Sequence, residues 1–210
     1  MALNQTENPS LWFIFQYLFG GTVDKRKLCL KHFKGRGRVL EIGCSLGNIS
    51  SVFIKHNNVD FLGIDIDKAA IEYVSRSFSS HSNVEFLCMD FLEFAKSSTN
   101  FDYILFAGSL HHMDDNLCHN MLHSAESVVD DNGLIVVVDP LLPRLDDPWF
   151  VREFIKLEQG EHLRTAQQMD DLVNSIDCLS IIHRDEVLIG ATPLGAPLCA
   201  RFIVYVFKKK

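Results

Sequence analysis

The sequence lacks several features that would place it in familiar classes of protein. Its six cysteines include no C-x-x-C pair and are widely scattered, several of them in apolar runs, where cysteine behaves as a small hydrophobe. This argues against a disulfide framework and favours a reducing, cytoplasmic location. The formal net charge is −7, and the absence of a basic excess disfavours a general nucleic-acid-binding surface.

Long apolar runs and export signals are missing as well. The N-terminal apolar stretch, residues 11–20, is too short to span a bilayer, and no basic region precedes it, so neither a membrane span nor a signal peptide is expected. The 210 residues contain 47% hydrophobic and 22% charged residues, which is a globular balance. This length suits one domain with a single core, or a core with a small lid.

From residue 36 onward, short apolar segments alternate with helix-like segments. Strands are expected at 39–42, 59–64, 84–88, 101–107 and 134–139, and helices at 46–55, 68–79, 114–129, 149–157 and 166–175. Near-continuous apolar strands separated by helices are typical of a parallel sheet covered on both faces. Two final apolar runs, 179–189 and 198–207, flank a segment rich in Gly and Pro, and this hairpin-like spacing predicts an antiparallel last strand.

The most informative stretch is residues 39–50, V-L-E-I-G-C-S-L-G-N-I-S, which joins an apolar run to a turn of small residues and a helix-like segment. A second apolar run ends in Asp65 and Asp67. Together these form a nucleotide-binding βαβ unit, in which glycines allow close backbone approach and the acid accepts hydrogen bonds from ribose hydroxyls. Glu41, just ahead of the turn, would repel a diphosphate but suits a ligand with ammonium and sulfonium charges, such as S-adenosylmethionine.

The turn resembles the first motif of the class I S-adenosylmethionine-dependent methyltransferases, E-x-G-x-G-x-G, with Ser45 at the middle glycine. The resemblance covers about residues 36–207. It implies an α/β fold, a three-layer doubly wound sheet of about seven strands, mostly parallel with one antiparallel C-terminal strand. The chain would then divide into an N-terminal helical lid, residues 1–35, and a Rossmann-like methyltransferase domain, residues 36–210. The implied cofactor is S-adenosyl-L-methionine, with S-adenosyl-L-homocysteine as its product.

The resemblance also implies which residues bind the cofactor. The turn under the methionine and ribose would comprise Glu41, Gly43, Cys44, Ser45 and Gly47. The other positions are Asp65 at the ribose hydroxyls, Ile66 and Phe91 beside the adenine, Asp90 at its amino group, and Ala107 and Gly108 near the amino acid end. A single acid after a strand is more often a helix cap, so the assignment depends on four motifs in the correct order.

His111 and His112 follow the fourth predicted strand, where substrate meets cofactor, and either imidazole is a candidate catalytic base because histidine titrates near neutral pH. The segment resembles the L-H-H turn of methyltransferases of the ubiquinone/menaquinone type, where these histidines often hold the loop by hydrogen bonds instead. His119 and His123, one helical turn apart, raise the alternative of a metal site. No cysteine or carboxylate pattern completes a ligand set, so no metal is expected.

Two further regions are candidates for substrate binding. Residues 11–19 are strongly aromatic and form either a core helix or a lid, with Trp12 or Tyr17 facing the substrate. A homodimer contact or a membrane-surface anchor ranks lower, because the segment lacks a basic polar face. Arg164 stands where a loop enters a helix and is a candidate clamp for an acceptor carboxylate or phosphate, against the alternative of an ordinary ion pair.

These features predict a methyltransferase that acts on a small-molecule acceptor, with oxygen or carbon favoured. The sequence G-S-L-H stands at residues 108–111, where N-P-P-Y or D-P-P-Y would mark a nucleic-acid amino-methylating enzyme, so no nucleic-acid partner is expected. Two rival functions remain open: a non-catalytic protein that binds the same cofactor, and a dinucleotide-dependent oxidoreductase. Glu41 and the missing third glycine of G-x-G-x-x-G argue against the oxidoreductase.

Overall fold

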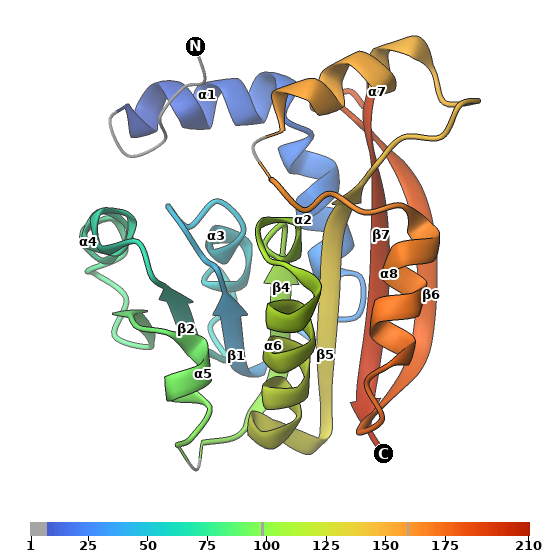
Figure 1. The fold of residues 1–210 in the computed structure, drawn as a ribbon. Coiled ribbons are helices and arrows are strands. Elements are labelled where there is room, and N and C mark those ends of the chain that lie inside the picture. The colour runs from blue at the N-terminus through green and yellow to red at the C-terminus, as the bar shows by residue number, and fades with distance from the viewer. Residues whose placement is uncertain (1–7, 98, 159) are drawn as a thin grey trace.

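The computed structural model describes residues 8–97, 99–158 and 160–210, and a seven-stranded sheet forms its centre (Figure 1). The strand order is β3-β2-β1-β4-β5-β7-β6. The bounds are β1 Gly37–Ile42, β2 Val59–Asp65, β3 Val84–Cys88, β4 Phe101–Ala107, β5 Val129–Leu141, β6 Leu179–Gly190 and β7 Leu198–Lys209. Of these seven strands, β7 alone points in the opposite direction and is antiparallel to both β5 and β6, which confirms the predicted mostly parallel sheet with one reversed C-terminal strand.

Helices cover both faces of this sheet and complete the three layers. They are α1 Pro9–Phe19, α2 Thr22–Leu30, α3 Ser50–Phe53, α4 Lys68–Ser77, α5 Phe91–Phe94, α6 Asp115–Val128, α7 Trp149–Phe154 and α8 Ala166–Asn174, with short 3-10 turns at Leu110–His112 and Ile155–Leu157. Because side chains alternate along a strand, the sheet supports two cores. Leu40 and Phe106 pack with residues of α6 and α8 on one face, while Val39 and Leu105 pack with α2 and α3 on the other.

Local sequence explains where several elements begin and end. Asp67 caps α4, since its side chain accepts hydrogen bonds from two backbone N–H groups of the first turn. The helix predicted at 46–55 is wrong in length: α3 spans only Ser50–Phe53, because Gly47, at φ 81°, turns the chain ahead of it. Strand β5 begins at Val129 rather than at residue 134, and its register against β4 shifts between Phe101 and Tyr103.

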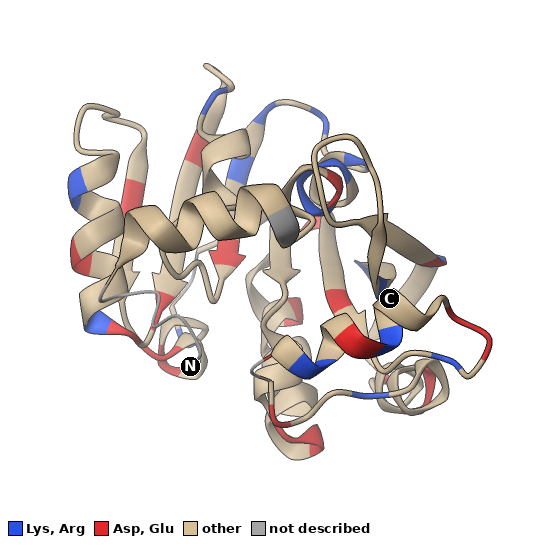
Figure 2. Cartoon of the chain, turned by 90° about the horizontal axis from the view of Figure 1, so that it is seen from above, with Lys and Arg blue, Asp and Glu red and all other residues tan. Residues whose placement is uncertain are grey.

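The two N-terminal helices lie outside the strand-helix alternation. Helix α1 crosses above the carboxyl ends of the strands, and Figure 2 shows no charged residue along its described part. It is joined to α2 by a hydrogen bond from the Thr22 hydroxyl to the Gln16 carbonyl, at 2.8 Å. The Phe13 ring lies 6.2 Å from that of Tyr73 on α4. None of the helices in the described ranges has the length and apolar character that a bilayer crossing requires.

Candidate functional site

The turn between β1 and α3, residues 43–49, is here called the glycine turn and is anchored to β2 by hydrogen bonds. The backbone N–H groups of Gly43 and Cys44 donate to the Ile64 carbonyl at 2.8 and 3.2 Å. The Asp65 carboxylate accepts from the Ser45 N–H at 2.8 Å and from the Asp67 N–H at 2.9 Å. Asp65, the residue predicted to bind ribose, therefore also determines the shape of the turn.

Ser45 stands in the turn where the family motif has a glycine. Its φ is 47°, in the left-handed region that side chains other than glycine adopt at a cost of about 1–3 kcal/mol. Gly43 and Gly47, at φ 77° and 81°, use the same region without that cost. The serine therefore preserves the backbone path of the motif, at some expense in stability.

Glu41 is buried beneath the turn, with 2% of its surface exposed. It accepts a 2.5 Å hydrogen bond from the Ser50 hydroxyl. Burial raises the pKa of Glu41 to about 8; the Ser50 hydrogen bond opposes this shift and the nearby charge of Asp65 adds to it. A carboxyl group in this state is suited to a positively charged ligand, which would favour its ionised form.

Ser109, which follows β4, supplies a polar group that the protein itself does not satisfy. Its hydroxyl is buried and has no hydrogen-bond partner. It lies beside the turn: a Cβ added to Gly43 would stand 2.9 Å from the Ser109 Cβ. Buried polar groups normally have partners, so this hydroxyl is available to bond a ligand between the turn and the end of β4. The residues present thus fit a small polar cofactor at this edge.

Other predicted cofactor residues divide between the surface and the core. Ile66 is 78% exposed after β2, and Met89, 43% exposed, follows the neighbouring β3, so an apolar surface is available for an adenine. Asp90 caps α5 through a 2.8 Å hydrogen bond from the Leu92 N–H. Phe91 is a correction to the sequence interpretation: it is 2% exposed and its ring packs edge-on against Phe106, so it belongs to the core.

Cys44, Gly47, Ala107 and Gly108 can contribute mainly through their backbone. The Cys44 side chain is buried with Ile71 and Val74. A Cβ on Gly47 would lie 2.6 Å from a methyl carbon of Val74, so the turn packs closely on α4. Ala107 ends β4, and Gly108, at φ 66°, donates its N–H to the Val138 carbonyl at 2.8 Å.

His111 occupies a buried position between two carboxylates. Its Nδ1 lies 3.2 Å from Asp139 Oδ1, and its Nε2 lies 3.4 Å from Glu158 Oε1. Burial alone would lower the pKa of His111, but the hydrogen bonds and charges of Asp139 and Glu158 outweigh it and raise the pKa to about 9. In this arrangement the two carboxylates favour the protonated form of His111.

His112 is the exposed member of the pair, and its ring centroid is 4.1 Å from that of His111. Its pKa is lowered by partial burial and by the neighbouring charge of His111. The two adjacent histidines therefore differ in environment: one is enclosed and carboxylate-bound, and the other opens to solvent at the carboxyl end of β4.

The segment after α7 folds back over residues 109–113, here called the His turn. The His162 N–H donates to the His111 carbonyl at 2.9 Å. A Cβ at Gly160 would lie 2.0 Å from His111 Cδ2, so only glycine permits this approach.

Asp139, Glu158, Gly160 and Ser109 were not predicted as site residues. Asp139 could have been found from its position at the end of a predicted strand. No pattern in the sequence indicates the contact of Glu158 with His111, because the two residues are 47 positions apart.

For Arg164 the structure favours the alternative of an ordinary ion pair over a clamp for an acceptor anion. Arg164 is 6% exposed and directs its guanidinium into the protein. Its Nε donates to Asp115 at 2.8 Å, and its Nη atoms donate to the backbone carbonyls of Leu110, Met113 and His162. Arg164 instead fastens the His turn to α6 and to the segment after α7, because a planar guanidinium can serve several acceptors at once.

The two aromatic residues predicted at the substrate both lie on α1. Trp12 is partly buried and packs edge-on against Phe13, with 5.2 Å between ring centroids. Tyr17 is 47% exposed. Their helix crosses above the carboxyl ends of the strands (Figure 1).

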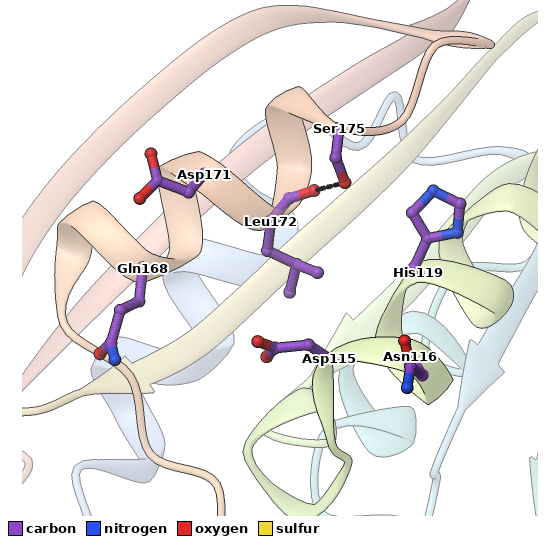
Figure 3. Close-up of a pocket in the computed structure, with 7 residues that line it drawn as sticks. All are labelled: Asp115, Asn116, His119, Gln168, Asp171, Leu172 and Ser175. Atoms are coloured by element: carbon purple, nitrogen blue, oxygen red, sulfur yellow. Dashed lines mark hydrogen bonds between the residues drawn. The ribbon is translucent and has the colours of Figure 1, made fainter.

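A separate groove of about 380 Å³ lies between α6 and α8 (Figure 3). It is lined by Asp115, Asn116, His119, Gln168, Asp171, Leu172 and Ser175. The Ser175 hydroxyl is bonded to the Leu172 carbonyl, and Asp115 is bonded to Arg164. None of the lining residues belongs to the glycine turn or to the His turn, so this groove is distinct from the predicted site.

Comparisons with known proteins agree with this architecture. Residues 39–133 match the family model described as a methyltransferase domain, and no curated protein sequence matches. A TehB-like SAM-dependent methyltransferase from Corynebacterium glutamicum is 18% identical, with a TM-score of 0.66 and 98% of each chain covered. A 1,6-didemethyltoxoflavin-N1-methyltransferase from Burkholderia thailandensis is 12% identical, with a TM-score of 0.69, and the alignment covers 97% of this chain and 83% of that one.

The mitomycin 7-O-methyltransferase MmcR is 15% identical, with a TM-score of 0.68. The alignment covers 90% of this chain but only 54% of MmcR. At these identities, the structural likeness establishes a shared fold. Together with the match of residues 39–133 to a methyltransferase domain, it supports the predicted resemblance to the class I S-adenosylmethionine-dependent methyltransferases. The cofactor of that class is S-adenosylmethionine.

Proposed function

We propose that this protein transfers a methyl group from S-adenosylmethionine to an oxygen or activated carbon atom of a small molecule. The observation that carries the proposal is the unsatisfied Ser109 hydroxyl, buried against the glycine turn between the carboxyl ends of β1 and β4. Ligands of open α/β sheets bind at this edge. The bound cofactor supplies an activated methyl group, so the protein contributes mainly by positioning the reactants.

Each part of the site has a role in this proposal. Asp65 accepts from the ribose hydroxyls while it continues to shape the turn, and Ile66 and Met89 pack against the adenine. Asp90 approaches the adenine amino group from the cap of α5. The amino acid end lies over the Gly43 turn, near Ser109 and the buried carboxyl group of Glu41.

The acceptor approaches from the side of the His turn. His112 is exposed there, directly after the strand whose end meets the methyl group, and an acceptor hydroxyl must lose a proton during transfer. We place His112 close to that proton on grounds of position. In this proposal His111, which lies between Asp139 and Glu158, helps to position the neighbouring His112.

Helix α1 is the proposed lid of this site, within an N-terminal unit of residues 1–35. Its uncharged surface crosses above the strand ends, which supports an acceptor with apolar or aromatic parts, contacted by Trp12 and Tyr17. Residues 1–7 of that unit lie outside the described residues. All six cysteines are free thiols, which supports a reducing, cytoplasmic location.

The Asp65→Ala variant tests the cofactor half of the proposal. Loss of the ribose acceptor and of the Ser45 anchor should weaken binding of S-adenosylhomocysteine at least about tenfold, since a hydrogen bond to a charged group contributes roughly 1.5–3 kcal/mol. Asp60→Ala, at an exposed position near the start of the same strand, is the matched control and should bind normally. Equal affinities in the two variants would contradict the assignment.

A further inference from the structure

The structure brings together a set of potential metal ligands that the sequence did not reveal. His111, His112 and Glu158 each offer one ligand atom, and these atoms all lie within 4.8 Å of one another. In the sequence Glu158 lies 46 residues beyond His112, whereas the fold brings it to the His turn from the segment after α7. This set is called the His-Glu cluster below.

One pair in the cluster already has the separation of two metal ligands. His111 Nε2 and Glu158 Oε1 are 3.4 Å apart. Two ligands on a tetrahedral ion with bonds of about 2.1 Å are separated by about 3.4 Å. An ion in place of the proton between these atoms therefore requires little movement of either side chain.

The surroundings of His111 match those of a metal-binding imidazole. Such a ring usually donates its second N–H to a carboxylate, which holds its orientation. Here Asp139, 1% exposed, lies 3.2 Å from Nδ1 and also accepts from the Leu110 N–H at 3.1 Å. The close approach of Gly160 restricts the orientation of the His111 ring. Nε2 is thereby directed at Glu158, toward the cluster.

The remaining two ligands keep the cluster accessible. The Glu158 side chain is 31% exposed and His112 is exposed, so an ion would retain open positions for water or an acceptor atom. Two imidazoles with one carboxylate suit zinc and its first-row transition neighbours better than magnesium or calcium, which prefer oxygen ligands.

We propose that His111, His112 and Glu158 bind one divalent transition-metal cation, with Asp139 orienting His111 from behind. The role of this cation in catalysis depends on the proposed function: it would lie on the acceptor side of the strand ends and hold an acceptor oxygen. Binding of the cation itself does not depend on methyl transfer, so the two proposals can fail separately.

The test uses the full chain, stripped of metal with a chelator and titrated with Co²⁺, whose visible absorption reports nitrogen and oxygen ligands. We expect one saturable equivalent per chain, displaced by Zn²⁺. His112→Ala and Glu158→Gln should each weaken Co²⁺ binding at least about tenfold. The matched control is the double variant His119→Ala/His123→Ala, which removes the stacked pair of histidines on α6 and should bind normally.

Three results would overturn the cation site: no saturable binding by the unmodified chain, normal binding by His112→Ala and Glu158→Gln, or loss of binding only in the α6 double variant. Melting curves of every variant report whether it is folded, and His112→Ala alters an exposed side chain and should fold. S-adenosylhomocysteine binding, measured in the same samples, separates the proposals. If it persists without Co²⁺ binding, only the cation site fails; if it is absent while Co²⁺ binds, only the proposed function fails.

Discussion

At the scale of single residues, the site is marked by polar groups placed where an ordinary core would have none. Glu41 is buried beneath the glycine turn, and the Ser109 hydroxyl is buried without a partner. Both carry a cost in the free energy of folding, because burial removes their contacts with water. A protein tolerates such costs where a ligand later supplies the missing interactions.

Ser109→Ala should therefore change stability and binding in opposite directions. Removing the unsatisfied hydroxyl should leave the melting temperature unchanged or higher, because the cost of burying it disappears. Affinity for S-adenosylhomocysteine should fall about five- to tenfold, the equivalent of one hydrogen bond of about 1–1.4 kcal/mol. Thermal unfolding and calorimetry on the same sample measure both. Unchanged affinity would remove Ser109 from the site.

Glu41 predicts an unusual pH dependence of stability. Its pKa in the folded state, about 8, is above the ordinary value of 4.5, so folding favours the protonated form. The contribution is fully present below about pH 4.5 and is lost as pH rises through 8. Without cofactor, Glu41→Gln should lose less stability than the wild type between pH 5 and pH 8.5. Glu85→Gln, at an exposed site on β3, should follow the wild type. Parallel curves for wild type and Glu41→Gln would refute this account.

Sequence reasoning found the residues of the glycine turn but not the direction of every side chain. Glu41, Gly43 and Asp65 follow from a local pattern, and the structure brings them together. The burial of Arg164 and Phe91 was not expected, because their orientation depends on distant partners: the backbone of the His turn for Arg164 and Phe106 for Phe91. A pattern read along the chain contains no information on such partners.

At the scale of elements, the glycine turn between β1 and α3 packs closely against α4. Gly47 combines φ 81° with a close approach to Val74. This is why the helix predicted from residue 46 begins only at Ser50. The strands at 84–88 and 101–107 were predicted with correct bounds, because turn residues flank their apolar runs.

Gly47→Ala should destabilise the protein by about 2–3 kcal/mol, since strain at positive φ adds to a clash with Val74. Gly195→Ala is the matched control: Gly195 has a similar φ of 78°, but a Cβ there would meet nothing within 4 Å. The control variant should lose only the stability that backbone strain at positive φ costs, about 1 kcal/mol. Chemical denaturation measures both. Equal losses would show that the turn does not pack tightly on α4.

The connection from α7 to α8 is the second element that shapes the site. Four residues of this connection contact the His turn: Glu158, Gly160, His162 and Arg164. The sequence placed a loop here but not its contacts, since they join segments far apart in the chain. The proposed acceptor side of the site is therefore built jointly by the ends of β4 and β5 and by this connection.

At the scale of the whole molecule, the sheet places every proposed cofactor contact at one edge. The carboxyl ends of β1, β2, β3 and β4 carry the glycine turn, Asp65, Asp90 and Gly108, and helix α1 crosses above them (Figure 1). The alternation of strands and helices was sufficient to predict this layered arrangement, because parallel strands buried on both faces need helical connections. The position of α1 was not predictable, since an apolar helix can bury itself in several ways.

The central claim is that this edge binds the methyl donor, and titration calorimetry of the unmodified chain with S-adenosylhomocysteine tests it most directly. The account predicts one site with micromolar affinity and no binding of nicotinamide dinucleotides, whose diphosphate would meet the buried acid Glu41. Absence of S-adenosylhomocysteine binding by a chain that still unfolds cooperatively would contradict it, as would preferential binding of a dinucleotide.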